Sequence, residues 1–358
     1  MKWRTMPLDV IKAAVPYAFV GGPFGSNLTT RDYLDEGVPV IRGNNLSAGS
    51  SFHDDDFVFV SEKKADDLRS NTAHAGDLVF TQRGTLGQVG LVPREPRFPR
   101  YIISQSQMKL TVDPETADAS FVYYFFRQPA TEQKVINHAV TSGVPHINLG
   151  ILKNFSITLP DVECQQRIAS ILSAYDDLIE NNRRRIQLLE QSARLLYKEW
   201  FVHLRFPGHE HARMIQGLPR KWSREPLEAV AEFRLGKMLD QEKNRGEPMP
   251  YLANVNVRWG SFDLHNLREM RFEHDEIDTY GLKFGDIAMC EGGEPGRCAI
   301  WREQHPQMMI QKAIHRIRCR HGMTHEYLYQ TLRHQGQSGQ MATLFTGATI
   351  RHLPREKL

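Results

Sequence analysis

The most regular feature of the sequence is a run of apolar positions between residues 168 and 200, whose spacing alternates between four and three. A period of 3.5 residues is typical of a left-handed coiled coil, in which a partner helix buries the seam. The seam alone spans roughly 50 Å at ~1.5 Å per residue. Pro160 precedes this run and Pro207-Gly208 follows it, so we predict one helix over residues 161–204. The predicted seam consists of Ile168, Leu172, Tyr175, Ile179, Asn182, Ile186, Leu189, Ala193, Leu196 and Trp200.

Polar and aromatic positions within this helix leave two interpretations open. A buried Asn in a coiled-coil seam commonly fixes register or partner orientation, and Asn182 is suited to that role. Beside it, the three arginines at residues 183–185 form either a solvated helix face or a contact for phosphate or for an acidic partner subunit. Near the end of the helix, Tyr197, Trp200 and Phe201 fit either internal packing or an interface anchor.

On either side of the predicted helix, strand patterns recur in the same order. Residues 37–45 and 248–256 are short β-rich runs that are entered through proline and end in amide side chains. Residues 76–84 and 285–293 each combine a Gly-Asp turn, a buried strand and a glycine-rich polar loop. Self-similarity at a spacing of more than two hundred residues indicates two copies of one domain.

Further landmarks complete the repeat. They are a Trp/Pro-Leu opening (3–8 and 222–227), a second strand (88–92 and 297–301), an amphipathic helix (121–127 and 327–333) and a turn of small residues (141–143 and 346–348). We therefore predict an α+β protein in which two pseudo-repeated, mixed, strand-rich domains are joined by a long coiled-coil-type helix. The domains are residues 1–160 (module 1) and 219–358 (module 2), with a linker at 205–218 after the helix.

The polar loop after the buried strand differs between the two modules. Module 1 has Gln82-Arg83-Gly84-Thr85 where module 2 has Glu291-Gly292-Gly293-Glu294. Gly, Asn and Ser can simply form turns, so a purely structural role stays open for any single loop. A shared scaffold with altered loop chemistry is what a protein needs if it recognises two similar but non-identical targets.

Bulk properties narrow the class of protein. With 358 residues the chain is too long for one ordinary core, and 41% hydrophobic with 24% charged residues is a globular composition. The net charge of +3 does not by itself indicate nucleic acid binding. No apolar run approaches the ~20 residues that cross a bilayer, so we expect no membrane association. The four cysteines form no CxxC pair, and the N-terminus lacks a signal peptide's apolar core, which indicates a reducing cytoplasm.

The sequence contains no catalytic constellation that we can identify. A Walker A sequence, an HExxH motif and an Asn-Pro-Pro-aromatic methyltransferase motif are all absent from it. His203, His209 and His211 lie close together in the linker, but loop histidines are more often solvated than metal ligands. We therefore predict no catalytic residue, no metal site and no cofactor in this chain.

Six short motifs occur in a fixed order along the chain. They are Gly22-Pro-Phe-Gly-Ser26, Gly37-Val-Pro-Val-Ile-Arg42, Gly76-Asp-Leu-Val-Phe80, Ser142-Gly-Val-Pro-His-Ile-Asn-Leu149, Ile157-Thr-Leu-Pro160 and Glu163-Cys-Gln-Gln-Arg-Ile168. With these motifs, the two variable modules joined by a heptad helix resemble the specificity (S) subunit of type I restriction–modification systems. The resemblance covers nearly the whole chain, and the order of the motifs is more specific than any one of them.

The resemblance implies a non-catalytic subunit that binds double-stranded DNA in the cytoplasm of a bacterium or archaeon. Each module would be a target-recognition domain that reads one half of an asymmetric, bipartite target, and the helix would set the spacer between the halves. Two modification subunits, which use S-adenosylmethionine to methylate adenine, would dock on the helical region. Restriction subunits that hydrolyse ATP with Mg²⁺ would join for cleavage.

One feature departs from the family pattern. Family members normally close with a second helix antiparallel to the first. This sequence instead reaches the segment from Thr346-Gly347 to His352-Leu353, the counterpart of Ser142-Gly143 through Asn148-Leu149, and ends at Leu358. An uncovered apolar seam favours association. We hypothesise either that the chain is truncated or that its helix pairs with another chain.

Candidate DNA contacts are the polar loop residues, because base edges are read by side-chain donors and acceptors and cations settle on phosphates. Arg suits guanine, Asn and Gln suit adenine, and Glu can accept from cytosine. A structural or solvated role is open for each of them. The candidates are Arg42, Asn44, Asn45, Gln82, Arg83, Thr85, Ser104, Gln105 and Gln107 in module 1, and Asn254, Asn256, Arg258, Glu291, Arg297, Gln311, Lys312 and His315 in module 2.

Two rival functions are distinguishable. A self-contained methyltransferase or nuclease would need the cofactor and metal motifs that the sequence lacks, and it would transfer methyl groups unaided. A coiled-coil scaffold with two protein-binding adaptor domains would show no salt-dependent DNA affinity, whereas a recognition subunit's affinity falls steeply with salt.

Overall fold

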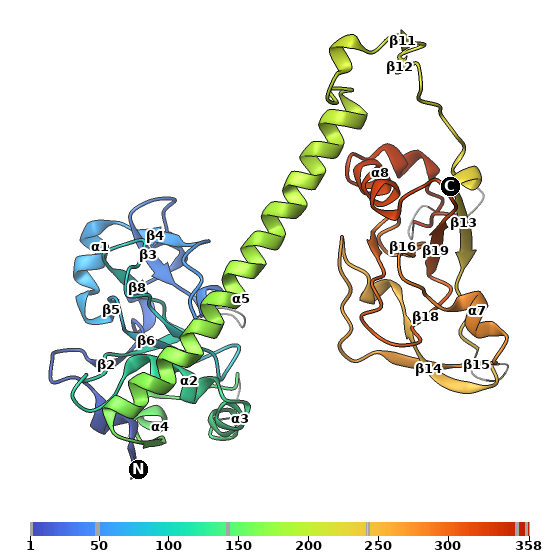
Figure 1. The fold of residues 1–358 in the computed structure, drawn as a ribbon. Coiled ribbons are helices and arrows are strands. Elements are labelled where there is room, and N and C mark those ends of the chain that lie inside the picture. The colour runs from blue at the N-terminus through green and yellow to red at the C-terminus, as the bar shows by residue number, and fades with distance from the viewer. Residues whose placement is uncertain are drawn as a thin grey trace. The chain divides into compact units, whose positions relative to one another are not determined.

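The computed structural model describes residues 3–46, 51–140, 144–240, 242, 244–347, 351–354 and 357. By its internal contacts the chain divides into two compact units, residues 1–187 and residues 188–358. Each unit is built from short strands and a few helices, and one long helix extends from the first unit into the second in sequence (Figure 1). The predicted α+β class is confirmed.

Module 1 contains two four-stranded sheets. The first sheet is antiparallel, in the order β2-β9-β6-β7. The second has the order β4-β3-β8-β5, and its central pair, β3 and β8, is parallel. The strands are β2 (Phe19–Gly21), β3 (Val38–Ile41), β4 (Val58–Val60), β5 (Thr72–Ala73), β6 (Leu78–Thr81), β7 (Val89–Leu91), β8 (Tyr101–Ile103) and β9 (Gln107–Leu110).

Helix α2 supplies much of the apolar core of module 1. Asp118 caps its first turn by accepting from the Phe121 N–H at 2.9 Å, and Phe126 packs edge-on against Phe80 of β6. Residues of β6, β9, α2 and β10 form one buried cluster. The remaining elements of the module are α1 (Glu62–Asp67), α2 (Ala119–Arg127), α3 (Pro129–Asn137), α4 (Leu149–Lys153) and the antiparallel pair β1 (Arg4–Pro7) and β10 (Ser156–Leu159).

Module 2 repeats this architecture. Its antiparallel sheet has the order β13-β19-β16-β17, and its second sheet has the order β15-β14-β18 with β14 and β18 parallel. Helix α8 covers the first sheet as α2 does in module 1. The elements are α6 (Leu227–Val230), β13 (Ala231–Leu235), β14 (Glu247–Leu252), β15 (Arg268–Phe272), α7 (Glu276–Tyr280), β16 (Ile287–Cys290), β17 (Cys298–Ile300), β18 (Met309–Ile310), β19 (Ile314–Cys319) and α8 (His325–Gln337).

The predicted repeat is confirmed in the order of the strands, although β5 has no counterpart among the described strands of module 2. In module 1, β6 pairs with β9 so that Phe80 lies opposite Met108, and in module 2 β16 pairs with β19 so that Met289 lies opposite His315. The closing segments also correspond, but in a different register from the one predicted. His146 bridges to Arg83 as His352 bridges to Gly292, so His352 is the counterpart of His146 and not of Asn148. The predicted small-residue turns at 141–143 and at 348 lie outside the described residues.

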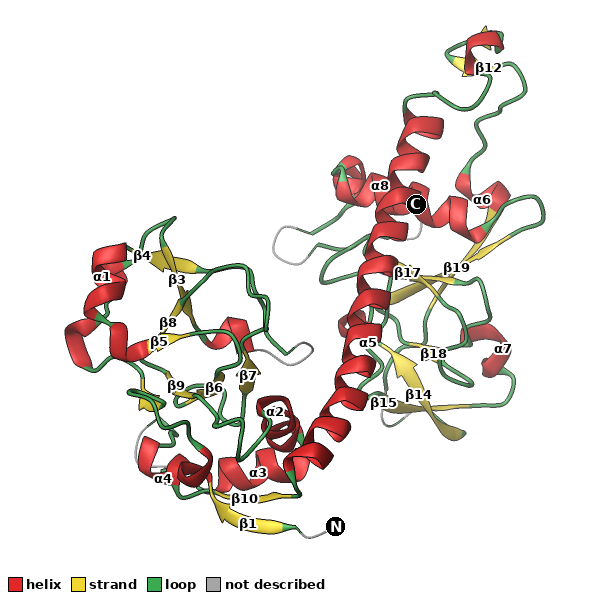
Figure 2. Cartoon of the chain, turned by 60° about the vertical axis from the view of Figure 1, so that its left-hand side comes forward, coloured by secondary structure: helices red, strands yellow, loops and turns green. Residues whose placement is uncertain are grey.

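The predicted long helix is α5 (Val162–Tyr197), and it continues as a π-helical segment from Lys198 to Val202 (Figure 2). Asp161 caps its start by accepting from the Cys164 N–H at 2.9 Å. Gln165, fully buried, fixes this end to module 1, because it accepts from the Asp118 N–H and donates to the Pro160 carbonyl, both at 2.9 Å. A short hairpin of β11 (Met214–Ile215) and β12 (Leu218–Pro219) follows the helix.

Candidate nucleic-acid interface

The loops that carry the predicted contacts of module 1 lie at one end of its two sheets. Strands β2, β3, β6 and β8 end there, and β7 and β9 begin there. Backbone hydrogen bonds join neighbouring loops: the Ser104 N–H donates to the Ile41 carbonyl at 3.0 Å, and the Gln82 N–H donates to the Ser106 carbonyl at 2.7 Å. We call residues 22–28, 42–46, 82–88 and 104–106 the module 1 loop face.

Asn45 and its counterpart Asn256 hold turns together. Asn45 is fully buried, its Oδ1 accepts from the Arg42 N–H at 2.9 Å, and its Nδ2 donates to two carbonyls of the following loop. Asn256 accepts from the Ala253 N–H at 2.9 Å and donates to the Asp263 carbonyl at 3.0 Å. Each amide is therefore committed within the protein, and reading adenine would break these bonds.

Three further predicted contacts in module 1 also have structural partners. Ser104 and Gln107 are buried and hydrogen-bond to each other through their side chains. Gln105 is more exposed, but its Nε2 donates to the carbonyls of Gly25 and Leu28, so it fixes the loop at 22–28. These side chains shape the loop face rather than presenting donors and acceptors to solvent.

The module 1 loop face exposes a smaller set of polar groups. Arg83 and Thr85 are exposed at the end of β6, and Gln82 is half-buried beside them. Arg42 is half-buried, and its Nη2 donates to the Asp56 carbonyl at 3.2 Å, while the exposed Asn44 lies 3.5 Å from the Asp56 carboxylate. Arg83 is therefore the cation of this loop that can most easily reach an external ligand.

In module 2 the corresponding loops lie at the equivalent end of the sheets. The Glu291 N–H donates to the Ala313 carbonyl at 2.8 Å, as Gln82 does to Ser106 in module 1, and the Gln311 N–H donates to the Leu252 carbonyl at 3.1 Å. Arg258 and Lys312 are exposed cations on these loops. We call residues 236–240, 254–258, 291–297 and 311–313 the module 2 loop face; 236–240 corresponds to 22–28 of module 1.

Several predicted contacts of module 2 are engaged internally. Arg297 pairs with Glu294 at 2.6 Å and donates to the Asn254 carbonyl at 2.8 Å. His315 is buried, with its Nε2 2.8 Å from the Leu353 carbonyl. Four others also make contacts within the module: Glu291 with His352, Asn254 Nδ2 with the Gly292 carbonyl, Gln311 with the Ala313 N–H, and Arg258 with Asp263 and the Val257 carbonyl.

The Gly-Asp landmark marks a buried ion pair that the sequence pattern did not predict. Asp286 is almost fully buried and accepts two hydrogen bonds from Arg318, both at 2.7 Å. In module 1, Asp77 lies 3.5 Å from the Lys109 ammonium and accepts from the Thr111 hydroxyl. The hydrogen bonds to the Asp286 carboxylate raise the pKa of Arg318. Only the fold brings these cations to the aspartates.

Along much of α5 the predicted seam is exposed in this chain. Leu172, Tyr175, Ile179, Ile186, Leu189 and Leu196 are all exposed, and so is Asn182. Ile168, by contrast, packs against the module 1 core. A partner helix for the exposed part of the seam stays a prediction, because the described residues place none along it.

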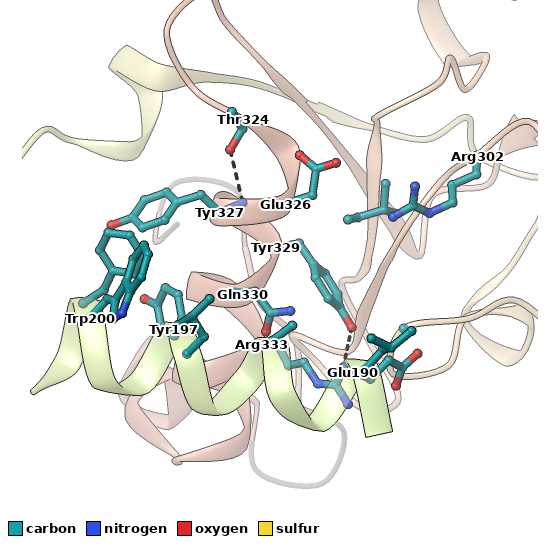
Figure 3. A pocket seen from close by; sticks show the side chains of 16 residues that line it. Glu190, Tyr197, Trp200, Arg302, Thr324, Glu326, Tyr327, Tyr329, Gln330 and Arg333 are labelled. Carbon is teal, nitrogen blue, oxygen red and sulfur yellow. Dashed lines mark hydrogen bonds between the residues drawn. The ribbon is translucent and has the colours of Figure 1, made fainter. Parts of the chain in front are cut away.

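Where the end of α5 meets α8, a groove of about 580 Å³ opens beside the seam (Figure 3). The Tyr197 hydroxyl donates a hydrogen bond at 3.1 Å to the Thr331 hydroxyl, and Phe201 packs edge-on against Tyr327 of α8. Tyr197 and Phe201 therefore pack against α8, which agrees with the internal-packing interpretation of these aromatic residues. The seam residues that line the groove are Leu189, Ala193, Leu196 and Trp200.

Within the described ranges, no group of three or more His, Cys, Asp or Glu side chains is arranged to hold a metal ion. Among the same residues, no helix has the length and apolarity that a bilayer span requires. The fold and the loop faces define a class: a protein that presents two versions of one polar loop scaffold, joined through a long helix.

Comparison with known proteins finds similarity to one family. Residues 26–191 match the model of the type I restriction modification DNA specificity domain. The type I restriction enzyme MjaIX specificity subunit of Methanocaldococcus jannaschii is 24% identical over 204 residues, covering 55% of this chain and 44% of that protein. The HindI specificity subunit of Haemophilus influenzae is 31% identical over 130 residues, covering 36% of this chain and 28% of that protein.

The fold agrees with this assignment. The crystal structure of a type I restriction–modification S subunit from M. genitalium matches with a TM-score of 0.56 at 16% identity, covering 96% of this chain and 80% of that one. Residues 26–191 therefore carry a type I restriction modification DNA specificity domain, and the chain is similar to the specificity subunits of type I restriction enzymes. The matched part of the chain spans less than half the length of the M. jannaschii and H. influenzae specificity subunits.

Proposed function

We propose that this chain is the DNA sequence-recognition subunit of a type I restriction–modification complex. Each module reads one half of an asymmetric, bipartite target. The observation that carries this proposal is the pair of loop faces, which have the same backbone scaffold but different side chains at equivalent positions. Arg83 in module 1 stands where Gly292 stands in module 2, so the two faces would select different bases.

We propose fewer direct DNA contacts than the polar residues of the sequence suggested. Asn45, Asn256, Ser104, Gln107 and His315 are removed from it, because their polar groups are buried or bonded within the protein. Gln105 is retained only as a residue that positions a loop. The proposed direct contacts are Arg42, Asn44, Gln82, Arg83, Thr85, Asn254, Arg258, Glu291, Arg297, Gln311 and Lys312.

The division into modules 1–160 and 219–358, with the helix at 161–204 and the linker at 205–218, is part of the proposal. α5 has 36 residues and is about 54 Å long at 1.5 Å per residue, longer than one turn of duplex at ~34 Å. Its length would set the number of unread base pairs between the half-sites. Two modification subunits carrying S-adenosylmethionine would dock on the helical region, and ATP- and Mg²⁺-dependent restriction subunits would join them in the cytoplasm.

A selection from randomised DNA tests the proposal. The full chain, alone and assembled with the modification subunits, is incubated with a library of randomised duplexes, and the bound duplexes are sequenced. We expect enrichment of two short motifs at a fixed separation, with affinity that falls steeply as salt increases. Binding without any enriched sequence would contradict the recognition role.

The exposed seam of α5 favours a second candidate function, a coiled-coil adaptor with two protein-binding domains. An adaptor would bind protein partners through its modules and would show no salt-dependent affinity for DNA. Titrating a labelled mixed-sequence duplex at two salt concentrations separates the two functions, because only the recognition subunit would bind and lose affinity with salt.

A further inference from the structure

Phe24 is the most exposed large apolar side chain of the described residues, with 89% of its surface open to solvent. It lies at the tip of the loop that follows β2, beside Gly25, which has a positive φ of 58°. An aromatic ring left in water at a loop tip gains nothing for the folded chain. Exposed aromatic residues on a recognition surface commonly serve as contacts for a partner.

The loop that carries Phe24 is held firmly in place. A side chain at Gly22 would collide with the Ser104 carbonyl, so the backbones of these two loops lie in direct contact. The Gly22 N–H donates to the Gln107 carbonyl at 2.8 Å, and Gln105 donates to the carbonyls of Gly25 and Leu28, which follow Phe24 in the loop. The ring is therefore presented by a fixed loop, which reduces the entropy that a contact would cost.

Module 2 presents an apolar tip at the equivalent position. A side chain at Gly236 would collide with the Gln311 carbonyl, as one at Gly22 would with that of Ser104. Two residues later Met238 is 57% exposed, and Leu239 beside it is also exposed. The bridge between Lys237 and Gln311 fixes this loop. Both modules thus carry an exposed apolar residue two positions after a glycine that packs tightly against the neighbouring loop.

These tips adjoin the polar loops that the proposed function assigns to DNA. In module 1 the chain of contacts runs from the Phe24 loop through residues 104–106 to Gln82 and Arg83. In module 2 it runs from the Met238 loop through residues 311–313 to Glu291. Apolar side chains on a DNA-reading surface contact thymine methyl groups or enter between base pairs that are partly unstacked.

We propose that Phe24 and Met238 are apolar DNA contacts, one for each half-site, and that each touches the bases next to the polar contacts of its own module. This inference rests on the proposed function. Because the contact is apolar, it adds affinity and sequence preference without releasing counterions. Its removal should therefore weaken binding by about 10- to 100-fold and leave the salt dependence unchanged.

The test compares the wild-type chain with Phe24→Ala and Met238→Ala in the randomised-duplex selection and in titrations at several salt concentrations. We expect Phe24→Ala to relax one half-site and leave the other intact, and Met238→Ala to do the reverse. Phe24→Leu should retain much of the affinity. Val10→Ala and Phe284→Ala remove exposed apolar side chains away from the loop faces and should change neither half-site.

Two probes distinguish the base features that are contacted. Replacing thymine by uracil in the selected duplex removes the methyl group, and 2-aminopurine at the same step brightens if the bases unstack. Either response, lost in Phe24→Ala, supports the proposal. Wild-type half-sites that persist in both alanine variants would overturn it while leaving the recognition function intact. A wild-type chain that selects no sequence would overturn both.

Discussion

The buried pair of Asp286 and Arg318 gives a prediction that the structure makes quantitative. The Asp286 side chain is 1% exposed, and it accepts from Arg318 Nε and Nη2 and from the Lys283 N–H, each at 2.7 Å. Replacing Asp286 with alanine removes all three acceptor contacts. It also leaves the positive charges of Arg318 and of the buried Arg316 without this carboxylate.

Breaking a buried ion pair by removing one partner costs about 3–5 kcal/mol. Here the Arg318 side chain is 28% exposed, so part of its guanidinium regains water when the carboxylate is gone. We therefore expect Asp286→Ala to lower the free energy of unfolding of module 2 by about 3 kcal/mol, the lower end of that range. Asp286→Asn, which keeps the shape and one acceptor, should cost less.

Urea unfolding followed by tryptophan fluorescence measures this change, because Trp301 is buried in module 2 and four of the five tryptophans lie beyond residue 199. Asp278→Ala serves as the control: this exposed carboxylate pairs with Lys283 at 3.1 Å, and its loss should leave the unfolding midpoint unchanged. A loss below about 1 kcal/mol for Asp286→Ala would refute the assignment of this pair as a structural anchor.

Other predictions test the remaining features. Asn45→Ala should destabilise module 1 by about 2–3 kcal/mol, since buried backbone groups lose their partner, and thermal unfolding against Asn44→Ala checks it. Arg83→Ala should relax the module 1 half-site about tenfold or more in the duplex selection, and an unchanged motif would exclude a base contact. If α5 pairs with another copy, light scattering should show a species larger than the monomer that Ile186→Glu disrupts, whereas a strictly monomeric wild type would count against such pairing. Burial raises the pKa of Tyr329 from 10.0 to about 12. The stability that the neutral side chain contributes is therefore present below pH 10 and is lost as pH rises to about 12. Over that range the denaturant midpoint of Tyr329→Phe should fall less than that of the wild type.

The sequence pattern predicted the elements of the fold well, because each landmark depends on local chemistry. The heptad run gave α5, and the Gly-Asp turns gave the buried strands β6 and β16 in their correct places. The repeat then predicted that two modules share one scaffold, which the matching sheet orders confirm. Period and turn residues are properties of neighbouring positions, so a single sequence is enough to show them.

The predicted contact residues were harder to judge, since an asparagine that closes a turn and one that reads adenine have the same side chain. Asn45 differs from Asn44 only in burial, and burial depends on segments distant in sequence. The Asn45 amide, for example, donates hydrogen bonds to carbonyls eight and ten residues later in the chain. Phe24 was not among the predicted contacts, because an apolar side chain is expected to lie in the core.

By itself the sequence determined the kind of protein: two copies of a strand-rich module, a helix with an apolar seam, and polar loops whose chemistry differs between the copies. The tertiary structure decided which side chains of those loops are free to meet a ligand. It paired Asp286 with Arg318, buried Asn45 and His315, and left the ring of Phe24 in solvent. The physical reason is that secondary structure follows from local periodicity, whereas exposure and hydrogen bonding are settled only when distant loops pack at the same end of a sheet.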